Sequence, residues 1–178
     1  MRKIFRSRKG LSTVVTTLII LVVSVLLATV VTYYAINITS TRVEEESLSV
    51  RKAHVWVSTA GTTTDTQAAF VIINTGGRDV VLDKITIRGQ EISWTDVYYS
   101  ISDTAPSGDL SYQNETTIGS SYTQATDDLL LPSGKSATIY ITDPGSISLQ
   151  DIGTTVSIVV FTAQAQYYKE CNVEAYTG

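Results

Sequence analysis

The sequence is poor in the residues that most often build catalytic and metal sites. It has one cysteine, Cys171, and one histidine, His54, among 178 residues. A single cysteine excludes an intrachain disulfide, and one residue of each kind is too few for a zinc site made of cysteine and histidine. The motifs G-x-S-x-G, Walker A and H-E-x-x-H are absent as well. We therefore expect no enzyme, no metal site and no cofactor. We expect Cys171 to be a small apolar residue near the last strand, with an interchain disulfide as the alternative.

Charge is also scarce and unevenly placed. Charged residues make up 17% of the chain, below the ~25% of an average soluble protein. Five of the 13 lysines and arginines lie in the first nine positions, and no acid lies there. From Leu11 onward, 8 basic residues face 17 acidic ones. A phosphate-binding surface needs clustered lysine and arginine, so this acidic balance predicts no nucleic-acid partner.

One long stretch, Gly10 to Thr41, contains no charged residue at all. A membrane-spanning helix needs roughly twenty apolar residues, and this stretch exceeds that length. The cations before it predict a cytoplasmic N-terminus with the remainder of the chain outside. The stretch is longer than the apolar core of a cleaved secretory signal. Its simplest interpretation is an uncleaved signal-anchor of a single-pass membrane protein.

The left edge of this stretch supports a more specific interpretation. The basic leader ends in Lys9-Gly10, and the apolar run begins immediately with Leu11. This junction resembles the class III signal peptide of archaeal type IV pilins and archaellins. The resemblance implies that a membrane prepilin peptidase cuts after Gly10, removes residues 1–10 and leaves Leu11 as the new N-terminus. Bacterial type IV pilins usually carry a glutamate at the fifth mature position, whereas this chain has Val15, which favours the archaeal branch.

The resemblance also implies a function. In that family the helix leaves the bilayer and packs against identical helices, so that the subunit polymerises into an extracellular filament. The implied partners are other copies of the chain, the prepilin peptidase, an assembly ATPase and a membrane platform protein. The precursor is expected in the cell membrane and the mature subunit on the cell surface. Adhesion pilus and archaellum share these features, so both stay open.

The fold predicted from the sequence is α+β, with a long N-terminal hydrophobic α-helix followed by an all-β, immunoglobulin-like sandwich head domain. We expect the helix over residues 11–52, because Val43, Ser47 and Val50 fit a helical stripe. The head domain is then expected over residues 53–178. Short apolar runs separated by glycine, proline and aspartate turns predict seven strands in it. The predicted strands are His54–Ser58, Ala68–Asn74, Val80–Arg88, Glu91–Ser100, Ala137–Thr142, Thr155–Ala163 and Ala165–Glu170.

Residues 101–126 are polar and rich in serine and glycine, and we expect them to form an exposed excursion between strands. This segment contains one of two N-glycosylation sequons, Asn114-Glu-Thr116; the other is Asn37-Ile-Thr39. Asn114 is the better candidate acceptor, because Asn37 would be crowded by the membrane or by a filament core.

Overall fold

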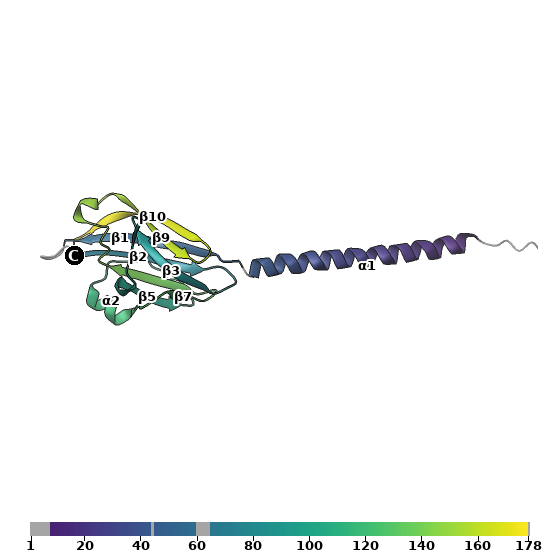
Figure 1. Ribbon diagram of the computed structural model, residues 1–178, viewed down its shortest axis with the longest axis horizontal. Helices are drawn as coiled ribbons and strands as arrows, with labels where there is room; N and C mark the ends of the chain where they lie inside the picture. The colour runs from purple at the N-terminus through teal and green to yellow at the C-terminus, as the bar shows by residue number, and fades with distance from the viewer. Residues whose placement is uncertain (1–7, 44, 60–64, 178) are drawn as a thin grey trace, which may run out of the picture. The chain divides into compact units, whose positions relative to one another are not determined.

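The computed structural model describes residues 8–43, 45–59 and 65–177 (Figure 1). It consists of an N-terminal helix, α1 (Arg8–Val43), and a strand-rich head, and the two form separate compact units divided after Val43. The α+β fold is therefore confirmed. The strands of the head are β1 (Leu48–Ser58), β2 (Asp65–Asn74), β3 (Val80–Ile87), β4 (Gln90–Glu91), β5 (Val97–Ser102), β6 (Thr123–Gln124), β7 (Leu129–Leu131), β8 (Ser136–Thr142), β9 (Thr155–Thr162) and β10 (Gln166–Tyr176).

The prediction that helix continues to residue 52 is wrong, because strand β1 already begins at Leu48. The alternation of Leu48 and Val50 places both side chains against the core of the head, which is a strand pattern rather than a helical stripe. Just before β1, the carbonyl of Ser47 accepts hydrogen bonds from the main chain of Thr75 and Gly76. A Cβ at Gly76 would lie 2.6 Å from the carbonyl oxygen of Glu45, so only glycine allows this close approach.

A β-bulge in β1 keeps one face of a long strand on the core. The pairing of β1 with β2 shifts register between Arg51 and His54, and Lys52 has a φ of 51°. Leu48 and Val50 face the core before the bulge, whereas Val55 and Val57 face it afterwards. The extra residue thus moves the core-facing side chains from even-numbered to odd-numbered positions of the strand. It also leaves Lys52, His54 and Trp56 for contacts away from the main core.

The strand order is that of an immunoglobulin-like sandwich. Along the sheet it runs β4-β3-β9-β10-β1-β2-β8-β5-β6, and β7 pairs with β3. Immunoglobulin domains place strands A, B, E and D in one sheet and C, F and G in the other. Here β1-β2-β8-β5 corresponds to A-B-E-D and β3-β9-β10 to C-F-G. Strand β1 joins the two halves, because it also pairs in parallel with β10 from Val55 to Ser58.

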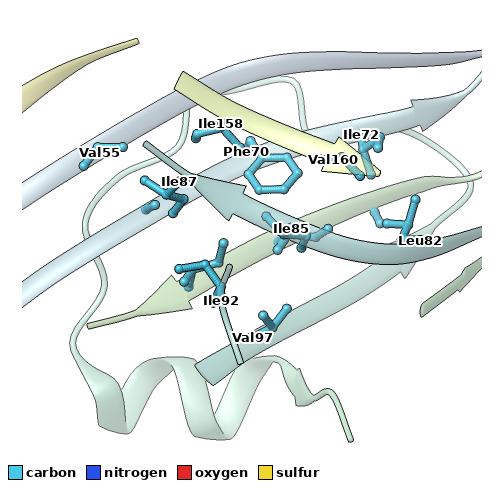
Figure 2. Close-up of a cluster of buried hydrophobic side chains, with 14 of the residues drawn as sticks. Val55, Phe70, Ile72, Leu82, Ile85, Ile87, Ile92, Val97, Ile158 and Val160 are labelled. Atoms are coloured by element: carbon cyan, nitrogen blue, oxygen red, sulfur yellow. The ribbon is translucent and has the colours of Figure 1, made fainter. Parts of the chain in front are cut away.

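Both halves of the folded sheet cover one apolar core (Figure 2). Phe70 and Ile72 of β2 point into it from one half, and Ile85 of β3 with Ile158 and Val160 of β9 from the other. All five side chains are at most 1% exposed. The sequence runs Val71–Ile73 and Ile158–Phe161 are apolar on both faces, which predicts that their strands are central. The structure confirms this, because β2 lies between β1 and β8 and β9 lies between β3 and β10.

Strands occur at all seven predicted places, but β1 and β2 begin earlier than predicted and the short strands β6 and β7 were not predicted. Two other predicted strands differ more. The segment predicted as one strand from Glu91 to Ser100 is interrupted by a 3-10 turn, Trp94–Asp96. The side chain of Ser93 caps this turn by accepting a hydrogen bond from the main-chain N–H of Thr95. The last strand extends well beyond its predicted end at Glu170 and continues to Tyr176. There it gains the parallel pairing with β1, a long-range contact that no local pattern announces.

The polar segment 101–126 is not simply exposed, as the sequence suggested. It contains the helix α2 (Glu115–Ser121), and Ile118 of that helix is fully buried. Ile118 packs with Trp56, Ala69 and Tyr140 in a second apolar cluster. We call this group, with the partly buried side chains around it, the aromatic cluster; those partly buried members are Tyr98, Leu110, Tyr112, Tyr122 and Tyr176.

Candidate functional site

The helix α1 carries the largest uncovered apolar surface among the described residues. Within its stretch Ser12–Ser40 an 18-residue window reaches a mean hydropathy of 2.9, and no residue of the stretch is buried. At about 1.5 Å per residue its 29 residues span about 44 Å, which exceeds the ~30 Å of a bilayer's hydrocarbon core. Every large side chain is between 45% and 65% exposed. These side chains are Val14, Val15, Leu18, Ile19, Ile20, Leu21, Val22, Val23, Val25, Leu26, Leu27, Val30, Val31, Tyr33, Tyr34, Ile36 and Ile38.

The hydroxyl groups within α1 do not make its surface strongly polar. Those of Ser24, Thr29 and Thr32 each donate to a carbonyl four residues earlier, at 2.7 to 2.9 Å. The hydroxyls of Thr16 and Thr39 do the same, and those of Thr17 and Ser40 donate to a carbonyl three residues earlier. A hydroxyl bonded to its own helix has its donor satisfied without water, so it can enter lipid or a protein interface at low cost.

The predicted processing residues Lys9, Gly10 and Leu11 lie in the first turns of α1. The structure describes their main chain, and residues 1–7 of the basic leader lie outside the described residues. No acidic residue occupies the first turn of α1. Nothing in the helix therefore offsets the positive end of its dipole with a negative side chain.

The two sequons lie in different surroundings. Asn37 is on α1, and its carbonyl accepts a hydrogen bond from Ser40. Asn114 is exposed at the N-cap of α2, where its Oδ1 accepts from the main-chain N–H and the hydroxyl of Thr117 at 2.9 and 2.7 Å. A glycan would be attached to Nδ2, so this cap is compatible with modification of Asn114.

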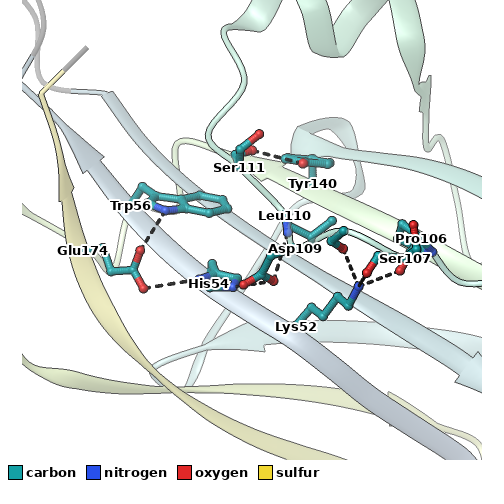
Figure 3. A network of polar contacts seen from close by, with 11 residues as sticks. Lys52, His54, Trp56, Pro106, Ser107, Asp109, Leu110, Ser111, Tyr140 and Glu174 are labelled. Atoms are coloured by element: carbon teal, nitrogen blue, oxygen red, sulfur yellow. Dashed lines mark hydrogen bonds and ion pairs between the residues drawn. The ribbon is translucent and has the colours of Figure 1, made fainter.

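The head holds a polar network that sequence reasoning missed (Figure 3). It fastens residues 103–114, which we call the strap, over the outer face of β1, β2 and β8. The ammonium group of Lys52 donates to the carbonyls of Pro106, Ser107 and Gly108, the first at 2.6 Å. The positive φ of Lys52 at the bulge accompanies this reach toward the strap.

His54 lies at the centre of the network, between two carboxylates from distant parts of the chain. Its Nε2 is 3.1 Å from Asp109 of the strap, and its Nδ1 is 3.3 Å from Glu174 of β10. Glu174 also accepts from the indole N–H of Trp56 at 3.1 Å, and the rings of His54 and Trp56 stack 5.3 Å apart. The hydrogen bond from His54, followed by the main-chain N–H of Leu110, lowers the pKa of Asp109 from its ordinary value.

Two further side chains attach the strap from neighbouring strands. Gln67 of β2 bonds both the N–H and the carbonyl of Gln113. Tyr140 of β8 donates its hydroxyl to the carbonyl of Ser111 at 3.1 Å. Burial raises the pKa of Tyr140 well above its ordinary value, so the phenol stays a hydrogen-bond donor at any physiological pH.

The contacts of this network attach the strap to the strands of the head. No nucleophile bonded to His54 is present among the described residues. The same part of the chain contains no group of three or more histidine, cysteine, aspartate or glutamate side chains placed to hold a metal ion. The two carboxylates beside His54 lie 55 and 120 positions away from it in the sequence, so sequence spacing could not have revealed the network. The alternation of Lys52, His54 and Trp56 along β1 was the feature of the sequence that came closest to indicating the network.

Comparison with known sequences does not assign the chain to a family. No known protein-family description matches the chain, and no characterised protein matches its sequence. The structure itself places the chain in a class: an apolar N-terminal helix, long enough to cross a membrane, followed by an immunoglobulin-like head. That shape is compatible with a pilin.

Proposed function

We propose that the protein is the structural subunit of an extracellular filament of the archaeal type IV pilus kind, either an adhesion pilus or an archaellum. The membrane holds the precursor through α1. A prepilin peptidase then cuts after Gly10, and an assembly ATPase with a membrane platform protein adds the mature subunit to the filament. In the filament, α1 packs against α1 of other copies, and the heads lie outside.

The observation that supports this proposal is the uncovered apolar surface of α1, which forms a compact unit separate from the head. A helix hydrophobic on every side must be covered, by lipid or by protein. Removing its 17 large, half-exposed side chains from water is worth on the order of 20 kcal/mol, whether lipid or protein covers them. Contacts between identical helices that do not close on themselves produce helical filaments.

The junction at Gly10 separates this proposal from a plain membrane anchor. The test is N-terminal sequencing of the protein from its native membranes and cell surface, for the natural chain and for Gly10→Phe. A bulky side chain before the cut should block an extended backbone from entering the peptidase groove. The matched control is Lys9→Arg, which keeps the charge beside the same bond.

The proposal expects a mature chain beginning at Leu11 in the natural protein and in Lys9→Arg, and an uncut precursor in Gly10→Phe. A natural chain that retains Met1 overturns it. That outcome supports the alternative function, a single-pass, membrane-anchored extracellular binding protein with an uncleaved signal-anchor. Tyr33 and Tyr34, positioned for the headgroup region at one end of the span, are compatible with either function before assembly.

A further inference from the structure

The strap is held by contacts of two kinds, which respond differently to pH. The hydrogen bonds that Lys52, Gln67 and Tyr140 make to the strap involve no side-chain type that ordinarily changes its charge between pH 5 and 8. The contact between His54 and Asp109 is different, because histidine is the side chain that ordinarily gains or loses its charge between pH 5 and 8. His54 is thus the variable member among the fastenings shown in Figure 3.

The two contacts of His54 depend on how many protons its ring carries. Both nitrogens lie near carboxylate oxygens, Nε2 beside Asp109 and Nδ1 beside Glu174. Ionised carboxylates only accept hydrogen bonds, and a neutral imidazole has only one N–H to donate. Both contacts are hydrogen bonds at the same time only when the ring is the imidazolium. Loss of one proton therefore leaves one nitrogen lone pair facing an anionic oxygen.

The other partners of Glu174 and Asp109 indicate which of the two contacts is lost when the ring of His54 is neutral. Glu174 is held in place by the indole N–H of Trp56 as well as by His54, and it belongs to a paired strand. Asp109 belongs to the strap, and its other partner is the N–H of the adjacent Leu110. Lys52 is the other charged group near Asp109, and it favours the ionised carboxylate at every pH considered. The neutral ring keeps Glu174 and releases Asp109.

We propose that His54 is a proton-operated latch, which fastens Asp109 and Leu110 of the strap when it is protonated and loosens these two residues when it is neutral. Leu110 is one of the partly buried members of the aromatic cluster. Residues 106–108 stay attached through Lys52, Ser111 stays attached through Tyr140, and Gln113 stays attached through Gln67. The latch is thus a local opening at Leu110, and it is independent of whether α1 assembles.

The test is amide hydrogen exchange of the full chain in detergent micelles at pH 5.5 and pH 8, corrected for the ordinary pH dependence of exchange. His54 is the only histidine, so its single set of imidazole NMR signals reports its protonation directly. Protection of the Leu110 amide is expected to be about two- to fivefold higher at pH 5.5, the range for a partly exposed ion pair. Protection of the Gln113 amide is expected to be the same at both values.

Matched variants separate the latch from general loosening. His54→Gln and Asp109→Asn should abolish the pH difference at Leu110. Asp103→Asn should keep it, because Asp103 pairs with Lys135 at the other end of the strap. Trp56 fluorescence gives a second readout, since an imidazolium stacked on the indole quenches it and Trp94 lies apart from the network. Equal Leu110 protection at both pH values while the His54 signals titrate overturns the proposal, as does a pH difference that persists in His54→Gln.

Discussion

The side-chain amide of Gln67 bonds both the main-chain N–H and the main-chain carbonyl of Gln113. Its Nε2 donates to the Gln113 carbonyl at 2.7 Å, and its Oε1 accepts from the Gln113 N–H at 2.9 Å. Gln67 lies near the start of the central strand β2 and is 3% exposed, so its amide is largely removed from water. A side chain of β2 thus substitutes for a neighbouring strand and gives the strap one β-like pairing.

Gln67→Leu is expected to lower the free energy of unfolding by about 1–3 kcal/mol, because it leaves two main-chain groups of Gln113 without their partner. Urea unfolding of the full chain in micelles measures the loss. The control is Gln113→Ala, whose side chain reaches only Ser111 while the bonds to Gln67 use its main chain. Equal losses in both variants would contradict this assignment.

Asp151 should contribute to the acid sensitivity of the head. Hydrogen bonds from Ser148, then from Arg88, hold its pKa below the ordinary value. A lowered folded-state pKa gives stability that is present above the unfolded-state pKa and is lost as pH falls through the folded-state pKa. Stability should therefore fall below about pH 4, and Asp151→Asn should lower stability above pH 6 and make the fall at acid pH smaller. Unfolding curves at stepped pH values measure this, with Asp127→Asn as an exposed control.

Cys171 should react slowly in the folded protein. It packs against the main core, and burial raises its thiol pKa to about 11. The thiolate is the reactive form, so a shift from 9.0 to about 11 reduces its fraction at pH 8 roughly a hundredfold. Thiol-exchange kinetics at pH 8 with and without denaturant compare the two states. Fast reaction without denaturant, or an interchain disulfide in the isolated protein, would show that Cys171 is not the small core residue inferred here.

A charge in the middle of α1 should prevent both membrane retention and assembly. Val23 is surrounded by apolar residues, and a lysine at a helix centre costs about 2.5–3.5 kcal/mol on insertion. Val23→Lys is expected to abolish surface filaments and to reduce the membrane-bound precursor. Val81→Lys, a similarly half-exposed valine on the head, should leave both unchanged. Filament yield and membrane fractionation measure the two effects, and normal filaments from Val23→Lys would contradict the buried position proposed for α1.

Local patterns were sufficient for the parts of the fold that are repetitive. The uncharged run predicted α1, and the apolar cores of β2 and β9 predicted the central strands, because burial on both faces leaves few polar residues in a strand. The boundary at Val43 was misjudged because Val43 and Val50 fit a helical period as well as a strand. Only the long-range contacts of Ser47 with Thr75 and Gly76 decide between them.

The network around the strap could not be predicted from the sequence. Asp109 and Glu174 look like ordinary surface acids, and the structure brings them to the two sides of His54. The segment 101–126 seemed to lack apolar anchors because its anchors are tyrosines, Leu110 and a single isoleucine, Ile118. Their spacing follows neither a helix nor a strand, so hydrophobic periodicity gave no signal there.

Electron cryomicroscopy of surface filaments, with the subunit identified by mass spectrometry, tests the central claim most directly. The account predicts filaments in which α1 of each copy begins at Leu11, surrounds the filament axis and buries its apolar side chains against other copies, with the heads outside. Cells lacking the chain should lose these filaments, and a swimming assay on the same cells then distinguishes archaellum from adhesion pilus. A chain that occurs in no filament and is extracted from membranes as a monomer still carrying Met1 would contradict the account.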